Sequence, residues 1–116
     1  MTTLAFRSVS SDVAVAPQLA PEAMAEAAAA GFRSVINNRP DFEGGPEQPT
    51  SASMEAAARA AGLRYEWLPV APNAHSADEI ARFAELLKTL PTPILAFCRS
   101  GARSSKLFSA AAAAPR

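Results

Sequence analysis

The sequence predicts an α/β fold: a three-layer sandwich with a mostly parallel sheet of four or five strands. Three observations support this. Short apolar or β-branched runs alternate along the chain with helix-like segments, several of them rich in alanine. These segments stop at a glycine or a proline, as helices commonly do. The run "ILAF" lacks polar alternation, which is typical of a strand covered on both faces. Alternating strands and helices form parallel βαβ units.

The elements are expected in a fixed order. They are an extended run over 12–19, a helix over 21–31, a strand over 32–38, a helix over 51–61, a strand over 63–70, a helix just after Ser76, a strand over 94–97 and a last helix from near Ser104. Pro21 suits a first helical turn and Gly31 a helix stop. Ser76 and Glu79 match a capping box. We expect these side chains to be buried: Val35, Ile36, Leu68, Val70, Phe83, Leu87, Ile94 and Leu95.

The charge balance and the cysteine and histidine content of the chain argue against several classes of function. The 116 residues are expected to form one domain, 1–116, and eleven basic and eleven acidic side chains cancel. Neither nucleic acid nor a membrane surface is therefore expected as a partner. No apolar stretch is long enough to span a bilayer, and "MTTLAFRSVSSD" lacks a signal-peptide pattern. One cysteine and one histidine form neither a disulfide nor an ordinary zinc site. We expect a cytoplasmic protein without a metal or a cofactor.

The single cysteine, Cys98, lies between an apolar strand and the start of a helix in "LAFCRSGARSSKL". Such a loop collects unpaired N–H groups and the positive end of the helix dipole, which together bind anions. A thiolate there is stabilised, so Cys98 should have a depressed pKa and act as a nucleophile. A lone cysteine beside a strand is usually a small buried hydrophobe. That alternative fits poorly with the Arg, Ser, Gly and Arg that follow.

The rest of the loop has features of an anion site. Gly101 lets the backbone curl so that its N–H groups point inward. The planar fork of Arg103 suits an oxyanion, which makes Arg103 the second catalytic candidate. Arg99 would add positive potential at the mouth, and Ser104 would hydrogen-bond the thiolate or cap the helix. The expected anion-binding loop comprises Arg99, Ser100, Gly101, Ala102 and Ser104.

Three residues outside the loop are candidates for the rim of the site. Arg39 and Asp41 follow the expected strand 32–38, at the same sheet edge as Cys98. Their structural alternative is a mutual salt bridge that holds the "NRPD" turn. His75, the one histidine, precedes the capping box and is a rim candidate unless it is simply exposed.

The loop "CRSGARS" resembles that of rhodanese-like sulfurtransferases and, more distantly, that of cysteine-dependent phosphatases. The segments "GFRSVINNRPDFEG", "AAGLRYEWLPV" and "PTPILAFCRSGARS" together resemble the beta-lactamase-hydrolase-like phosphatase-like domains, formerly DUF442, over residues 6–110. This resemblance implies a fold like that of dual-specificity phosphatases. It also implies a candidate partner, a metallo-β-lactamase-like persulfide dioxygenase.

The spacing within the loop favours sulfur transfer over phosphate hydrolysis. Four residues separate Cys98 from Arg103, as in rhodanese-like enzymes, whereas protein phosphatases have five; Phe97 also replaces the usual histidine. A phosphatase needs a general acid, for which Asp41 is a candidate. Sulfur transfer needs none. We therefore expect a Cys98 persulfide and a small sulfur-containing anion or thiol as substrate. A phosphatase that forms a phosphocysteine from a phosphoester, and a non-catalytic redox-sensing or binding module, remain alternatives.

Overall fold

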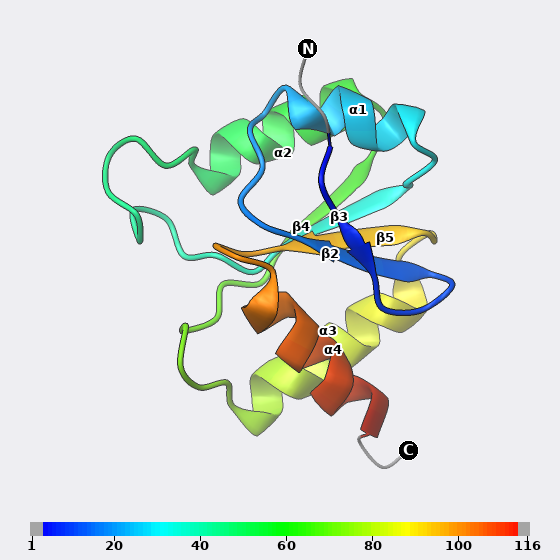
Figure 1. Ribbon diagram of the computed structural model, residues 1–116, viewed down its shortest axis with the longest axis vertical. Coiled ribbons are helices and arrows are strands. Elements are labelled where there is room, and N and C mark those ends of the chain that lie inside the picture. The colour runs from blue at the N-terminus through cyan, green and yellow to red at the C-terminus, as the bar shows by residue number, and fades with distance from the viewer. Residues whose placement is uncertain (1–3, 114–116) are drawn as a thin grey trace.

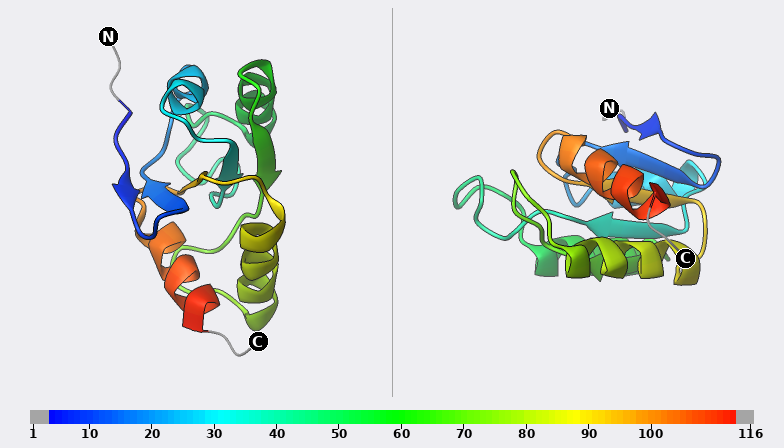
Figure 2. Two further views of the ribbon diagram at one scale, coloured as in Figure 1. Left: turned by 90° about the vertical axis from the view of Figure 1, so that its right-hand side faces the viewer. Right: turned by 90° about the horizontal axis from the view of Figure 1, so that it is seen from below.

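A five-stranded sheet lies between two pairs of helices in the computed structural model, which describes residues 4–113 (Figure 1). Its elements are β1 (Arg7–Ser8), β2 (Val13–Ala16), α1 (Ala23–Ala29), β3 (Ser34–Asn37), α2 (Ser51–Ala60), β4 (Arg64–Trp67), α3 (Ala77–Thr89), β5 (Ile94–Phe97) and α4 (Ala102–Ala113). Helices α1 and α2 cover one face of the sheet, and α3 and α4 cover the other (Figure 2). The predicted three-layer α/β sandwich is confirmed.

The sheet brings four strand ends to one edge. The strand order is β1-β2-β5-β3-β4; β2, β5, β3 and β4 run parallel, and only the pairing of β1 with β2 is antiparallel. In register, Ala16 and Asn37 flank Phe97, and Trp67 lies beside Asn37. The connections that follow these four residues therefore leave the sheet side by side. Ligands of parallel α/β sheets bind at such an edge.

Two apolar layers hold the helices on the sheet. Met24, Met54 and Leu95 belong to the layer under α1 and α2, and Phe83 and Leu107 belong to the layer over α3 and α4. Every residue of β2, β3 and β5 is buried, as expected of strands covered on both faces. Burial of each large apolar side chain contributes about 1.5–3 kcal/mol. The central strand β5, which leads to Cys98, is thus fixed from both sides.

Several predicted boundaries shift. The capping box is confirmed: Glu79 N donates to Ser76 Oγ at 3.1 Å, and Ser76 N donates to Glu79 Oε1 at 2.7 Å. The predicted helix 21–31 begins only at Ala23, because Glu22 is the N-cap. The last helix starts at Ala102, two residues before the expected position, which places Arg103 in its first turn. Strand β1 was not predicted, because its two exposed residues carry no hydrophobic pattern.

The predicted core is correct except at two leucines. Leu68 is only partly buried, because it follows β4 at the edge of the sheet. Leu87 is also only partly buried, whereas its neighbour Leu86 is buried beside Phe83. Leu86 and Leu87 lie about 100° apart around α3 because they are adjacent in the helix. Leu87 therefore lies at the margin of the apolar face, where it packs against the buried cluster.

Across residues 4–113, the helices are too short or too polar to cross a membrane.

Candidate active site

Cys98 lies at the base of the loop between β5 and α4. Its N–H donates to Ala16 O at 3.3 Å, and the preceding carbonyl of Phe97 accepts from Asn38 N at 2.8 Å. These bonds extend the sheet pairing by one residue on both sides of β5. Cys98 is 1% exposed, so its thiol is buried beneath the loop. A reacting group has to reach it through the mouth of the loop.

The loop stabilises the thiolate form of Cys98. Burial raises the pKa of the Cys98 thiol, but hydrogen bonds from the N–H and hydroxyl of Ser104 and from the N–H groups of Gly101 and Ser100 lower it by more. The Gly101 N–H donates to Cys98 Sγ at 3.1 Å. The hydroxyl of Ser104 has one proton, which it donates to Asn38 Oδ1 at 2.8 Å. We therefore attribute the lowered pKa of Cys98 mainly to the backbone donors.

Gly101 is required by the shape of the loop. Its φ of +94° lies in the region that L side chains rarely adopt. A Cβ at this position would also lie 3.4 Å from the backbone carbon of Ala16, on the neighbouring strand β2. Both facts favour glycine. They account for the curled backbone that the sequence predicted.

Arg103 is buried and does not present an empty fork to the loop. Its Nη1 and Nη2 donate to the two carboxylate oxygens of Glu43 at 3.1 and 3.0 Å, and Nη1 also donates to Val70 O at 3.0 Å. Its Nε is buried and has no partner among the described residues. The sequence suggested that the planar fork of Arg103 suits an oxyanion. An internal carboxylate already occupies it.

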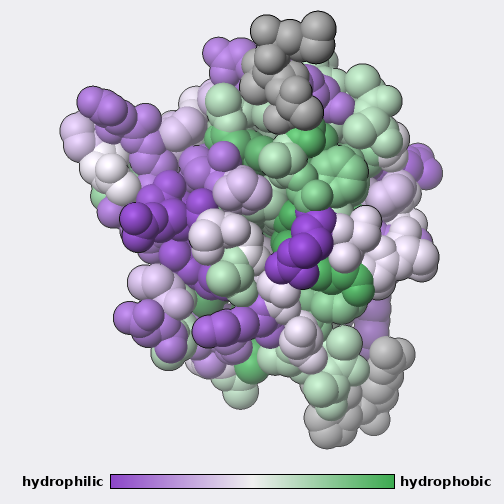
Figure 3. Space-filling model, in the orientation of Figure 1, coloured by the Kyte–Doolittle hydropathy of each residue, from purple (hydrophilic) through white to green (hydrophobic). Residues whose placement is uncertain are grey.

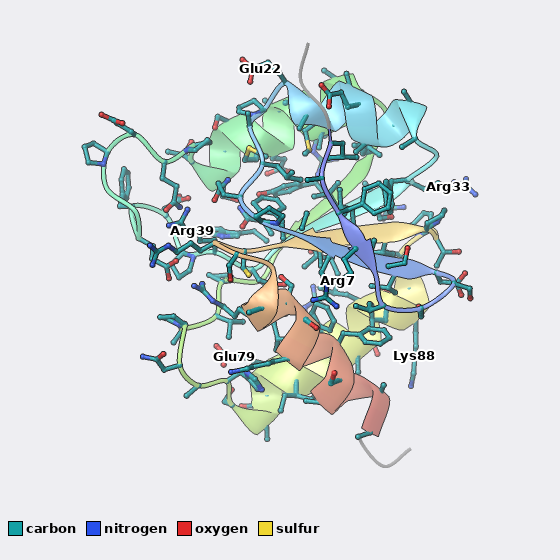
Figure 4. All side chains as sticks on the ribbon, in the orientation of Figure 1. Arg7, Glu22, Arg33, Arg39, Glu79 and Lys88 are labelled. Carbon is teal, nitrogen blue, oxygen red and sulfur yellow. The ribbon has the colours of Figure 1, made fainter. Side chains whose placement is uncertain are left out.

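Arg39 adds a second guanidinium to the same carboxylate. Its Nε donates to Glu43 Oε1 at 2.9 Å, and its Nη1 donates to Gln18 Oε1 at 3.1 Å. The backbone of Arg39 is held as well, because its carbonyl accepts from Trp67 Nε1 at 2.9 Å. The side chain lies close over Gly44, where a Cβ would be 2.7 Å from Arg39 Nη2. Arg39 is therefore fixed in position (Figure 4).

Glu43 is held in its ionised form. Burial raises the pKa of its carboxyl, but hydrogen bonds from Arg103 and Arg39, together with their positive charges, lower it by more. Its side chain is 20% exposed, so part of the pair still faces solvent. A carboxyl with a lowered pKa is a poor proton donor near neutral pH. Glu43 therefore organises the arginines and is poorly suited to act as a general acid.

A cleft of about 540 Å³ opens beside these groups. It is lined by Arg39, Glu43, Gly44, Pro72, Arg99 and Arg103. Arg99 is exposed, and its backbone carbonyl accepts from Gln18 N at 3.1 Å. The cleft thus joins the loop after Cys98 to the connections that follow β3 and β4. It has the location and the charge of a site for anionic ligands.

The predicted rim residues separate into two groups. Arg39 lines the cleft, whereas Asp41 and His75 do not. Asp41 Oδ1 accepts from Ser51 N at 2.7 Å, at the start of α2. This bond replaces the salt bridge with Arg39 that the sequence suggested. His75 is partly buried in the connection before α3.

Four residues of the site were missed by sequence reasoning: Glu43, Gln18, Asn38 and Val70. Asn38 donates to Leu68 O at 3.0 Å and accepts from Ser104, which ties the loop to the neighbouring connections. A signal for two of them existed, because Asn38 and Glu43 lie within the quoted segment "NNRPDFEG". Gln18 and Val70 accept hydrogen bonds from Arg39 and Arg103, and these contacts between distant segments are visible only in the folded chain. Within residues 4–113, no cluster of three or more His, Cys, Asp or Glu side chains could hold a metal ion.

The fold and the family match identify this chain as a phosphatase-like α/β domain. The chain belongs to the family described as "Beta-lactamase hydrolase-like protein, phosphatase-like domain", whose model matches residues 5–115. It is similar to a beta-lactamase hydrolase-like protein of Xylella fastidiosa (strain Temecula1), with 40% identity over 78 residues, or 67% of this chain. The match spans 18% of that relative's length. The predicted family is confirmed.

Solved structures show the same architecture. A candidate phosphatase of Neisseria meningitidis Z2491 has a TM-score of 0.83 and 28% identity, covering 94% of this chain and 79% of that one. The core catalytic domain of a PP-IP phosphatase of S. cerevisiae, solved with citrate, has a TM-score of 0.63 and 14% identity, covering 83% and 56%. The second likeness shows the fold alone. Together the comparisons favour the phosphatase alternative over the sulfurtransferase that the loop spacing suggested.

Proposed function

We propose that this chain is a cysteine-dependent phosphatase that forms a phosphocysteine at Cys98. The observation that carries the proposal is the hydrogen bond from Gly101 N to Cys98 Sγ at the start of α4. A thiolate stabilised at a helix N-terminus is a competent nucleophile, and the surrounding N–H groups suit phosphoryl oxygens. Membership of a phosphatase-like family supports this choice.

The reaction has two steps. The Cys98 thiolate attacks phosphorus, so that an S–P bond forms while the bond from phosphorus to the leaving oxygen breaks. The leaving oxygen keeps the electron pair of that bond. Water then attacks the phosphocysteine, which releases inorganic phosphate and restores the thiolate; the proton of the water passes to solvent. Fixed N–H groups of the loop stabilise the charge that develops in both steps.

The arginines play different parts in this proposal. Arg103 acts as a positioning residue, because its bonds to Glu43 and to Val70 O tie α4 to two neighbouring connections. Arg99 and Arg39 line the cleft and attract the anionic substrate.

Sulfur transfer is the second candidate. The four residues between Cys98 and Arg103, and the lowered pKa of Glu43, favour a reaction that needs no proton donor. In that reaction the thiolate attacks the outer sulfur of a donor such as thiosulfate. An S–S bond forms on Cys98, and sulfite leaves with the electron pair of the broken bond.

One purified sample distinguishes the two candidates. The protein is treated with an aryl phosphate or with thiosulfate, quenched in acid and analysed by intact-mass spectrometry, with Cys98→Ser as the control. The phosphatase proposal expects one added phosphoryl group and steady release of phosphate, both lost in Cys98→Ser. Addition of one sulfur atom with no phosphate release would overturn it in favour of sulfur transfer.

A further inference from the structure

We infer that the substrate is a small molecule with at least two anionic groups, and that its leaving group is itself an anion. This inference rests on the proposed function and specifies the substrate class for the same site. The formal net charge of the chain is zero, so the positive charge at the site is local.

The first observation is an excess of positive charge. Three guanidinium groups line the cleft, from Arg39, Arg99 and Arg103, and Glu43 is the one carboxylate there among the described residues. Glu43 accepts from Arg39 and Arg103. Arg99 makes no ion pair with any residue in 4–113. An excess of two positive charges thus remains in the cleft for a ligand.

The second observation is that one of these positive charges, the guanidinium of Arg39, is held in place. Arg39 is 8% exposed and is bonded at its backbone and at two of its guanidinium nitrogens. The backbone of Arg99 is held by Gln18, and Gln18 also accepts from Arg39. Gln18 therefore links the guanidinium of Arg39 to the backbone of Arg99. A preorganised cation such as Arg39 binds an anion at a small entropic cost.

The third observation is the character of the walls. None of the cleft's lining residues is aromatic, and Pro72 and Gly44 are its only uncharged ones. The exposed aromatic residues Phe42 and Trp67 are not among them. Figure 3 shows hydrophilic side chains gathered at the end of the molecule where Figure 4 places Arg39. Such walls suit a second anionic group better than the ring of an aryl phosphate.

The missing proton donor points to the leaving group. An alkoxide leaving group needs a general acid. The one carboxylate that lines the cleft is Glu43, whose pKa is lowered by its two arginines. A phosphoanhydride does not need a general acid. When Cys98 attacks the terminal phosphorus, the bond from that phosphorus to the bridging oxygen breaks, and the electron pair leaves with a phosphate, which is a stable anion without protonation. Arg99 and Arg39, which line the cleft, supply positive charge that attracts that anion.

Binding is tested first, because it does not depend on turnover. Isothermal titration calorimetry on Cys98→Ser protein, which cannot turn the ligands over, compares pyrophosphate with phosphate, and 3-phosphoglycerate with glycerol 3-phosphate, which has a hydroxymethyl group in place of the carboxylate. We expect the more highly charged member of each pair to bind roughly tenfold more tightly, the usual effect of a charged hydrogen bond. Arg99→Ala should remove most of this difference, and Lys88→Ala, at the opposite end of the molecule, should preserve it (Figure 4). Equal affinities within both pairs would overturn the inference.

Turnover then tests the leaving group. We expect phosphate release from pyrophosphate to be at least tenfold faster, in kcat/KM, than from glycerol 3-phosphate, with both activities lost in Cys98→Ser. Equal rates, or a preference for the alkyl ester, would overturn the leaving-group argument and leave the proposed function intact. If an aryl phosphate, pyrophosphate and glycerol 3-phosphate all fail to add a phosphoryl group to Cys98, the proposed function itself is refuted. The pyrophosphate pair and the 3-phosphoglycerate pair of the binding experiment show whether the second anionic group of the substrate is a phosphate or a carboxylate.

Discussion

Glu43 precedes Arg103 by 60 residues, yet its two carboxylate oxygens accept from two nitrogens of the Arg103 guanidinium at 3.0 and 3.1 Å. The pair connects the loop after β3 to the first turn of α4. Arg39 shares one of the same oxygens, so a single carboxylate organises two arginines. The geometry is that of a bidentate pair, which fixes direction as well as distance.

Glu43→Gln should destabilise the protein by about 1–3 kcal/mol at pH 7. The loss of one partner from a buried ion pair costs more, but Glu43 is partly exposed and glutamine keeps one acceptor. Because the folded pKa of Glu43 is lowered, its contribution is present above the ordinary glutamate pKa of about 4.3 and is lost as pH falls through the lowered value. Urea unfolding at stepwise pH measures this. A difference that persists unchanged at pH 3 would contradict it.

Cys98 should react as a thiolate below the usual pH range of thiols. The rate of iodoacetamide alkylation should rise with an inflection below about 8.5, the ordinary cysteine pKa, because the loop N–H groups lower the pKa of Cys98. The same protein in denaturant provides the control and should titrate near the ordinary value. Coincident inflections in the two states would show that the folded loop does not activate the thiol.

Arg103→Lys should lower kcat by about 100-fold, the scale of losing one preorganised contact in an active site. An ammonium cannot reproduce the two parallel bonds to Glu43 together with the bond to Val70 O. Arg33→Lys is the matched control, since Arg33 is exposed and does not line the cleft. Steady-state kinetics and thermal unfolding check both variants. Equal losses of activity in the two would argue against a positioning role for Arg103.

Gly44→Ala should displace the Arg39 side chain. The added Cβ would lie 2.7 Å from Arg39 Nη2, so the guanidinium would have to move. We expect weaker pyrophosphate binding, by roughly threefold to tenfold, the scale of one ordinary hydrogen bond, because the Arg39 guanidinium is displaced and not removed. In an Arg39→Gln background the same substitution should have little further effect. Independent, additive effects in this double-mutant cycle would show that the two residues do not act together.

Much of the fold could be predicted, because its strands and helices carry strong local signals. The capping box at Ser76 fixed the start of α3, and the unbroken apolar run of β5 was located at its observed bounds, 94–97. The two-residue strand β1 carries no such signal. Its pairing depends on tertiary contact with β2, which local pattern does not encode.

The candidate site was only half accessible to sequence reasoning. Cys98, Gly101 and Arg103 stand close together in the chain, so their loop could be recognised from spacing. The partner of Arg103 could not be recognised in this way, because Glu43 lies 60 residues away in another connection. That connection also contains Asp41, a second carboxylate that the sequence alone does not exclude as the partner. The sequence therefore suggested an oxyanion for the fork of Arg103 and missed the carboxylate of Glu43 that is bonded to it. A bond between distant loops is decided by strand order and register.

The loop that carries Glu43 is largely closed upon itself. Gln48 Nε2 donates to Pro40 O at 2.8 Å, and Gly44 N donates to Gln48 Oε1 at 2.7 Å. Its own hydrogen bonds therefore hold its shape, while the layers of the core lie elsewhere. The exposed positions of such a loop can change with little penalty to folding, whereas Glu43 has to be kept because it is bonded to both arginines. The protein thus carries an exchangeable loop beside its nucleophile, and replacement of the exposed positions of 40–48 around a retained Glu43 is the economical route to redirect its specificity.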